Sequence, residues 1–275
     1  AILPFWQSLT LKEKAAQTLM VYMPSASYIK KHQFGGVLIM KPHLKDTLHL
    51  KEELSLANES LKIPLLTAID QEGGKVNRLQ AISPEWKNLP SAKEMRAMTD
   101  DSVYNLAKQI GNALHHYGIN LNLAPVLDPP KDSKGKPSFI EVSNRSFGEF
   151  ETAVPKIRSF VKGMKESKVL STSKHFPGYD SWTNSDHQIA FSTSSKDVIL
   201  KNVELFKEFA DEIPVIMLSS VRFVRLSNTP AVFNPKITAM AREISPYTVL
   251  LTDDLWGVSL RAWISGTDKV KGKNY

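Results

Sequence analysis

The feature that most constrains this chain is an apolar run that ends abruptly in polar, ionisable residues, and such a run occurs four times. Each run is short and rich in aliphatic residues, which is typical of a buried strand. One such strand end would mean little, because every buried strand must end somewhere. Four strands that end in carboxylates, a lysine and a histidine predict one shared site. The runs cover 64–69, 119–125, 169–173 and 248–252, and they lead into Asp70, Asp128, Lys174 with His175, and Asp253 with Asp254.

Helical patterns separate these runs and indicate how the strands are arranged. In 101–117 apolar residues recur at helical spacing, with Asp100 or Asp101 as the expected N-cap and Gly118 as the stop. The same reading applies to 152–167, 196–209 and 235–244. Alternating strands and helices favour a parallel sheet, and in a TIM-type (β/α)8 barrel the catalytic groups lie on the loops that follow the strands. We therefore predict an α/β fold of this type.

The number of candidate strands falls one short of a closed barrel. Seven are predicted, at 18–22, 36–40, 65–69, 119–124, 170–173, 215–218 and 248–251. A closed barrel needs eight. The last β/α unit is therefore missing, and the chain is a fragment, or its barrel stays open or is closed by something else. We expect the first and seventh strands to present unpaired edges, which the segment 2–6 or a second chain would cover.

Composition predicts one domain over residues 1–275 and excludes several classes of protein. The chain has 275 residues, a length typical of an α/β barrel, and no apolar run long enough to span a membrane. Because cysteine is absent, disulfides, thiolate zinc sites and a cysteine nucleophile are excluded. The net charge of +7 comes from lysines spread over the helices. This pattern predicts a solvated surface rather than a nucleic-acid partner, although an anionic small ligand remains compatible.

Five motifs together give a specific resemblance. They occur at 70–78 (DQEGGKVNR), 123–128 (LAPVLD), 144–148 (NRSFG), 174–178 (KHFPG) and 252–255 (TDDL). In this order they resemble glycoside hydrolase family 3, and most of all its single-domain β-N-acetylglucosaminidases of the NagZ type, which trim peptidoglycan fragments. The resemblance runs from about Leu9 to Trp256, which is nearly the whole chain.

The resemblance implies roles for particular residues. Retaining glycoside hydrolysis needs a carboxylate nucleophile and a proton donor for the leaving oxygen. By resemblance Asp253 is the nucleophile, and Asp254 is a supporting or capping residue, although sequence alone would allow the reverse. The residues implied to hold the sugar's hydroxyl and N-acetyl groups are Asp70, Arg78, Asp128, Arg145, Lys174 and His175.

The loop after Gly178 departs from the family pattern. Relatives of the NagZ type carry an Asp-Ser-His motif there, whose Asp–His pair is the general acid/base. Counted from Lys174, His187 falls in the place of the family histidine, but Ser185 takes the place of the aspartate and Asp186 that of the serine. Three alternatives follow: the carboxylate has moved by one residue to partner His187, Asp180 or Asp186 acts in another geometry, or the pair is broken. We favour a working site, because a loop absorbs such a shift more easily than a strand.

The predicted function is hydrolysis of terminal β-linked N-acetylglucosamine, released from peptidoglycan-derived fragments through a covalent intermediate on Asp253. The alternatives are a family 3 β-glycosidase or phosphorylase of other specificity, and a non-catalytic barrel that binds muropeptides or a protein partner. No metal or organic cofactor is expected, because the chemistry needs only two protonatable groups and contacts to the sugar. The sequence does not fix the compartment, and a bacterial periplasm or cell envelope is slightly favoured over the cytoplasm.

Overall fold

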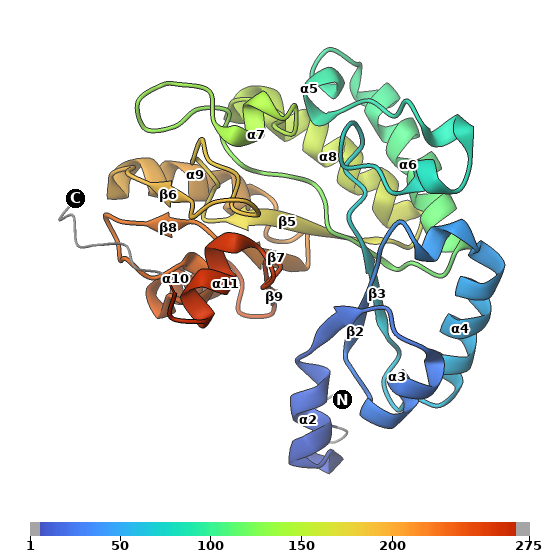
Figure 1. Ribbon diagram of the computed structural model, residues 1–275. Helices are drawn as coiled ribbons and strands as arrows, with labels where there is room; N and C mark the ends of the chain where they lie inside the picture. The colour runs from blue at the N-terminus through green and yellow to red at the C-terminus, as the bar shows by residue number, and fades with distance from the viewer. Residues whose placement is uncertain (1–5, 268–275) are drawn as a thin grey trace.

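The computed structural model describes residues 6–267 of the chain, and within them seven parallel strands form one curled sheet (Figure 1). The strand order is β1-β2-β3-β4-β5-β7-β9. The strands are β1 (Met20–Tyr22), β2 (Gly36–Ile39), β3 (Leu66–Ile69), β4 (Leu121–Asn122), β5 (Leu170–Phe176), β7 (Val215–Leu218) and β9 (Val249–Thr252). All seven predicted strands are confirmed, with β4 shorter and β5 longer than predicted. In the described part of the chain no strand joins β9 to β1, so the fold is a TIM-type barrel open on one side.

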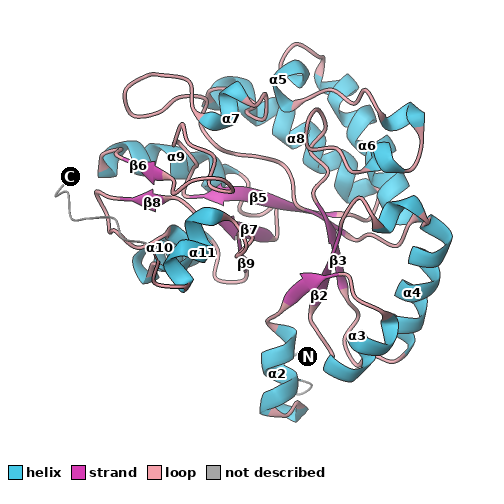
Figure 2. Cartoon of the chain, in the orientation of Figure 1, coloured by secondary structure: helices cyan, strands magenta, loops and turns pink. Residues whose placement is uncertain are grey.

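Helices follow most strands and pack on the outer side of the curled sheet (Figure 2). The helices in the described part of the chain are α2 (Leu11–Gln17), α3 (Ala26–His32), α4 (Thr47–Glu59), α5 (Ala92–Met95), α6 (Asp100–His116), α7 (Phe139–Val142), α8 (Phe150–Glu166), α9 (Lys196–Glu208), α10 (Pro235–Ile244) and α11 (Val258–Ile264). Short 3₁₀ turns lie at η1 (His43–Lys45), η2 (Leu79–Ala81), η3 (Pro84–Trp86) and η4 (Ala231–Phe233). None of the helices described is long and apolar enough for a membrane crossing.

The four helices predicted from the sequence are α6, α8, α9 and α10, and each is found within two residues of its predicted limits. The predicted cap of α6 was wrong. Thr99 is the N-cap, and its hydroxyl accepts a hydrogen bond from the backbone N–H of Ser102. Asp100 and Asp101 lie instead in the first turn, where a carboxylate interacts favourably with the positive end of the helix dipole.

The alternation of side chains along each strand divides the core between the two faces of the sheet. On β7, Ile216 and Leu218 belong to the large cluster shared with the helices. Val215 and Met217 belong to a smaller cluster with Ala68, Leu121 and Leu123. Both faces of the sheet are therefore apolar, as expected for parallel strands covered on both sides, and the smaller cluster fills the inside of the curl.

The opening between β1 and β9 exposes apolar side chains at the two edges of the sheet. Leu19, which precedes β1, is 50% exposed, and Val249 in β9 is 48% exposed. Residues 1–5 of the segment expected to cover these edges lie outside the described residues, and Trp6 is itself exposed. Elsewhere, β6 (Phe191–Ser192) and β8 (Arg222–Phe223) form a separate two-stranded parallel pair.

Helices α6 and α8 cross so closely that glycine is required at the contact. A β-carbon built on Gly163 would lie 2.6 Å from the carbonyl oxygen of Tyr104 and 2.8 Å from Cβ of Ala107. On the other helix, a β-carbon on Gly111 would lie 2.6 Å from Cβ of Ser167. Because the atoms met at Gly163 are mostly backbone, the crossing has no flexible side chain that could make room.

We therefore predict that Gly163→Ala destabilises the protein, although alanine is the better helix former by about 1 kcal/mol. Overpacking at the crossing should outweigh that gain and cost about 1–3 kcal/mol. Urea denaturation would measure the change as a lower midpoint at an unchanged slope. Asn112→Ala, at an exposed position of α6, is the control and should be neutral or slightly stabilising. A Gly163→Ala variant as stable as the parent would contradict the close crossing.

Candidate active site

The predicted site residues lie at one end of the barrel, because all strands of the sheet run parallel. Asp70 follows β3, Lys174 and His175 lie in β5, and Asp253 follows β9. Asp128 arrives on the segment after β4, which runs beside β5 through a parallel bridge between Val126 and Lys174. The structure thus places Asp70 and Asp253 at the same end of the sheet.

A break in strand pairing lets two consecutive residues of β5 serve this end. Lys174 pairs with Met217 of β7, but the next pair is Phe176 with Leu218, so His175 lies in a register shift. Consecutive side chains of a regular strand point to opposite faces, and an extra residue in one strand changes that alternation. The shift therefore allows the side chains of both Lys174 and His175 to contact carboxylates at the site.

Lys174 is the centre of a buried ionic network. Its Nζ atom lies 2.9 Å from Oδ1 of Asp70 and 2.6 Å from Oε1 of Glu72. Glu72 in turn accepts hydrogen bonds from Nε and Nη2 of Arg145, each 2.8 Å long. This bidentate pair fixes the orientation of the guanidinium plane. The network joins the end of β3 to β5 and to the loop that carries Arg145.

Sequence reasoning assigned no role to Glu72, although it stands in the first quoted motif. Burial alone would raise the pKa of Glu72, but the charges of Arg145 and Lys174 outweigh burial and hold that pKa well below its ordinary value. Burial would likewise lower the pKa of Lys174, and Asp70 and Glu72 raise it instead. The carboxylate of Glu72 and the ammonium group of Lys174 are therefore both charged. The signal that could have identified Glu72 is its position two residues after a strand-end aspartate and beside two glycines.

Asp128 is buried, and both of its carboxylate oxygens form hydrogen bonds with other protein groups. Its Oδ1 atom accepts hydrogen bonds from the backbone N–H groups of His175, at 2.8 Å, and Tyr179, at 2.7 Å. Its Oδ2 atom lies 2.6 Å from Nδ1 of His175. This contact fixes the orientation of the imidazole ring. Asp128 thus orients His175, and both of its carboxylate oxygens are already in hydrogen bonds with protein groups.

Asp70 and Arg78 form the more exposed part of the candidate site. Nη2 of Arg78 lies 3.8 Å from Oδ2 of Asp70, and both side chains remain partly exposed. The Nε atom of Arg78 is buried without a hydrogen-bond partner among the residues described. The structure therefore brings together Asp70, Arg78, Arg145 and Lys174 as one charged surface, with Arg145 and Lys174 at its base. In the described residues no three His, Asp or Glu side chains form a group that could hold a metal ion.

Asp253 lies at the end of β9 with one carboxylate oxygen fixed. Its backbone N–H donates to the carbonyl of Leu218 at 3.1 Å, which continues the pairing of β9 with β7. Its Oδ1 atom accepts a 2.8 Å hydrogen bond from the backbone N–H of Asp254. Asp253 is partly buried, whereas Asp254 is exposed. A carboxylate fixed through one oxygen at a rigid strand end can present its other oxygen to a ligand.

The loop 179–187 is folded over this end and held at several points. The hydroxyl of Tyr179 donates to the carbonyl of Thr183 and accepts from the backbone N–H of Ser185 at 2.8 Å. The far end of the loop contacts the start of α11, because the N–H groups of Val258 and Ser259 donate to the carbonyls of Asp186 and Ser185. The departure from the family pattern is thus accommodated in an ordered loop.

The three candidate acid groups on this loop lie in different surroundings. Asp180 is buried, and its carboxylate accepts a hydrogen bond from Ser194. Asp186 is exposed and lies beside the segment after Asp253, where its carbonyl accepts from the backbone N–H of Val258, and loss of solvation together with the charge of Asp253 raises its pKa. His187 is exposed, and its ring makes no hydrogen bond within residues 6–267. Asp180 is thus enclosed with Ser194, whereas Asp186 lies on the exposed part of the loop beside the turn that follows Asp253.

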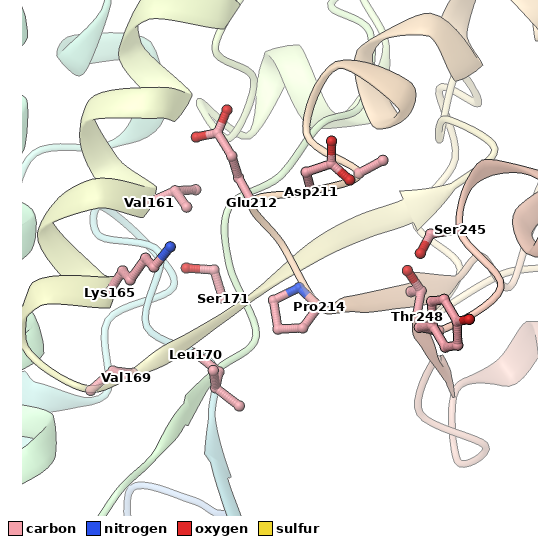
Figure 3. Close-up of a pocket in the computed structure, with 12 residues that line it drawn as sticks. Val161, Lys165, Val169, Leu170, Ser171, Asp211, Glu212, Pro214, Ser245 and Thr248 are labelled. Carbon is pink, nitrogen blue, oxygen red and sulfur yellow. The ribbon is translucent and has the colours of Figure 1, made fainter.

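A separate cavity of about 410 Å³ lies at the opposite end of the barrel. Its lining includes Leu170 and Ser171 at the start of β5, Pro214 before β7 and Thr248 before β9 (Figure 3). Asp211 and Glu212 also face this cavity. None of the predicted site residues lines it, so the volume of a cavity alone would not have located the polar site.

Comparisons with known proteins agree with the fold and with the motifs. The family described as "Glycosyl hydrolase family 3 N terminal domain" matches residues 10–254. A "Beta-hexosaminidase" of Pseudomonas aeruginosa is 27% identical over 238 residues, which are 82% of this chain and 68% of the relative.

Two solved structures share the fold. A β-N-acetylhexosaminidase from Beutenbergia cavernae superimposes with a TM-score of 0.80 at 24% identity, covering 93% of this chain and 82% of that chain. A glycoside hydrolase family 3 β-N-acetylglucosaminidase from Paenibacillus also gives a TM-score of 0.80, at 26% identity, covering 93% of this chain and 51% of that chain. The family match, which spans most of the sequence, shows that the chain belongs to glycoside hydrolase family 3.

Proposed function

We propose that this protein is a retaining, exo-acting β-N-acetylglucosaminidase that releases terminal N-acetylglucosamine through a covalent glycosyl-aspartate on Asp253. The observation that carries the proposal is the position of Asp253. Its carboxylate is fixed through Oδ1 at the end of β9, at the same barrel end as the charged surface of Asp70, Arg78, Arg145 and Lys174. The relatives named β-hexosaminidase support the reaction type.

The proposed reaction proceeds in two displacements. In the first, Oδ2 of Asp253 attacks the anomeric carbon, the bond to the leaving oxygen breaks, and that oxygen takes a proton from the loop 179–187. In the second, water attacks the anomeric carbon and returns a proton to the loop, and the bond to Asp253 breaks. This sequence restores both groups and retains the anomeric configuration.

The charged surface is suited to hold a sugar before either step. A sugar offers many hydroxyl groups and little apolar area, so its affinity depends on fixed polar contacts. In the proposal Asp70, Arg78, Arg145, Lys174 and His175 contact the hydroxyl and N-acetyl groups. Asp128 acts through His175, because both of its oxygens are occupied. Glu72 holds Arg145 and Lys174 in place.

The proton donor is assigned to the loop, with His187 as the family position and Asp186 as its partner or replacement. The raised pKa of Asp186 supports a donor role, because an acid with a raised pKa keeps its proton to higher pH. The proposed substrate class, peptidoglycan-derived fragments, follows from the resemblance to NagZ-type enzymes. A non-catalytic barrel that binds such fragments is the second candidate, favoured by the altered loop and the open side of the sheet.

Turnover of a chromogenic N-acetyl-β-glucosaminide, with the matching β-glucoside as control substrate, separates these candidates. We expect hydrolysis of the former and little of the latter. Asp253→Ala should lower kcat/KM by roughly 10⁴-fold or more and leave the dissociation constant for N-acetylglucosamine within about 3-fold. Asp211→Ala, which removes a carboxylate at the opposite end of the barrel, should retain parental activity. A parent protein that binds the sugar without hydrolysing either substrate would establish the non-catalytic alternative.

The proton donor can be identified from how far its removal lowers kcat/KM for substrates with different leaving groups. Nitrophenolate leaves without much protonation, whereas a sugar hydroxyl needs it. Loss of the donor should therefore lower kcat/KM for a β-linked N-acetylglucosamine disaccharide by roughly 10²- to 10⁴-fold and spare the nitrophenyl glycoside.

We expect this asymmetry for His187→Ala, and His115→Ala, at an exposed position of α6, is the control. Equal losses on both substrates for His187→Ala would remove the donor role from His187. The same asymmetry found in Asp186→Asn alone would then assign the role to Asp186.

A further inference from the structure

A side-chain hydrogen bond spans the open side of the barrel at the site end. Tyr22, the last residue of β1, donates from its hydroxyl to Oδ2 of Asp254 at 2.6 Å. Asp254 lies just beyond β9. In the sheet, β1 pairs with β2 and β9 pairs with β7, and these two strands form the free edges. The contact therefore joins the first and last strands where backbone pairing between them is absent from the described structure.

Asp254 connects this bridge directly to Asp253. Its other carboxylate oxygen, Oδ1, accepts from the backbone N–H of Trp256 at 2.9 Å and so closes the turn after β9. Its own backbone N–H donates to Oδ1 of Asp253 at 2.8 Å. A displacement of Asp254 would thus move the group that fixes the Asp253 carboxylate. Within residues 6–267, β9 pairs with β7 alone, so backbone pairing supports its C-terminal end on one side.

The surroundings of Tyr22 keep its hydroxyl a donor. Partial loss of solvation raises the pKa of Tyr22, and the hydrogen bond and charge of Asp254 add to the effect, as do the charges of Asp70 and Asp186. The hydroxyl is therefore protonated at any pH at which a glycosidase would operate. As the last residue of β1, Tyr22 lies at the same end of the parallel sheet as Asp70 and Asp253.

We propose that Tyr22 is a positioning residue: by donating to Asp254 it holds the turn 253–256 against the first strand and so fixes the carboxylate of Asp253. This inference rests on the proposed function of Asp253 as nucleophile. Its expected consequence is kinetic, because a small misplacement of a reacting group costs rate more than it costs binding of the ground state.

The test uses Tyr22→Phe, which removes the hydroxyl and keeps the ring. With a nitrophenyl N-acetyl-β-glucosaminide we expect kcat to fall by about 10- to 100-fold, while calorimetry with N-acetylglucosamine gives a dissociation constant within about 3-fold of the parent. Asp254→Ala should show the same split. The double variant should be no slower than Asp254→Ala, because residues that act through one contact are not additive.

Tyr28→Phe is the matched control. Tyr28 is 49% exposed, close to the 43% of Tyr22, and its hydroxyl makes no hydrogen bond within the described range, so this variant should match the parent. Thermal unfolding of each variant ensures that rates are compared on folded protein. An unchanged kcat in Tyr22→Phe, a parallel loss of binding and turnover, or additive effects in the double variant would each overturn the inference.

Hydrogen exchange provides a measurement that does not depend on turnover. The amides of Asp254 and Trp256 should exchange about 10-fold faster in Tyr22→Phe than in the parent, since loss of the bridge frees the turn. Unchanged exchange would contradict the bridge as a constraint on Asp253. A parent protein without activity would refute the proposed function, and the exchange result would still decide whether Tyr22 holds the turn.

Discussion

The buried ammonium group of Lys174 is the charge on which the polar end of this barrel depends. A buried cation is stable only when it is paired, and Lys174 is paired with Asp70 and Glu72, both from the segment after β3. Glu72 completes the arrangement by holding Arg145. Removing one partner from such a network typically costs about 3–5 kcal/mol, because a charge is left buried without compensation. The network thus fixes three segments that are distant in the sequence.

A second set of contacts extends this rigidity toward the loop. Asp128 holds His175 beside Lys174 and also accepts from the backbone of Tyr179. Tyr179 then fixes the loop 179–187 through its hydroxyl, and the loop contacts the start of α11. Through these contacts the end of β5 is linked to the segment that follows Asp253. An open barrel can therefore keep its site ordered through side-chain contacts where strand pairing is incomplete.

The strands and long helices could be predicted because apolar periodicity records which face of each element is buried. That signal placed Asp70, Lys174, His175 and Asp253 at one end of the sheet. It did not identify Glu72 as the partner of Arg145, because the pairing depends on a loop far along the chain. Nor did it distinguish Asp128, which orients His175, from residues open to a ligand. The cap of α6 was expected at Asp100 or Asp101 and lies at Thr99, because threonine and aspartate are both good N-cap residues.

In the loop after Gly178, the family pattern alone does not identify the acid group. The sequence left Asp180, Asp186 and His187 open as acid groups, and only the fold separates them. Asp180 is buried and accepts from Ser194, whereas the contact of the loop with the start of α11 holds Asp186 beside the turn that follows Asp253. Of the three groups, Asp186 and His187 are therefore the exposed ones, and Asp180 is buried.

The central claim, that Asp253 forms a covalent glycosyl intermediate, is tested most directly by the stereochemistry of the first product. Proton NMR, recorded before mutarotation, would follow the anomeric signals as a β-linked N-acetylglucosaminide is hydrolysed. Two displacements at the anomeric carbon predict that β-N-acetylglucosamine appears first and the α anomer only later. Initial release of the α anomer would mean a single displacement by water and would contradict the role of Asp253 as nucleophile.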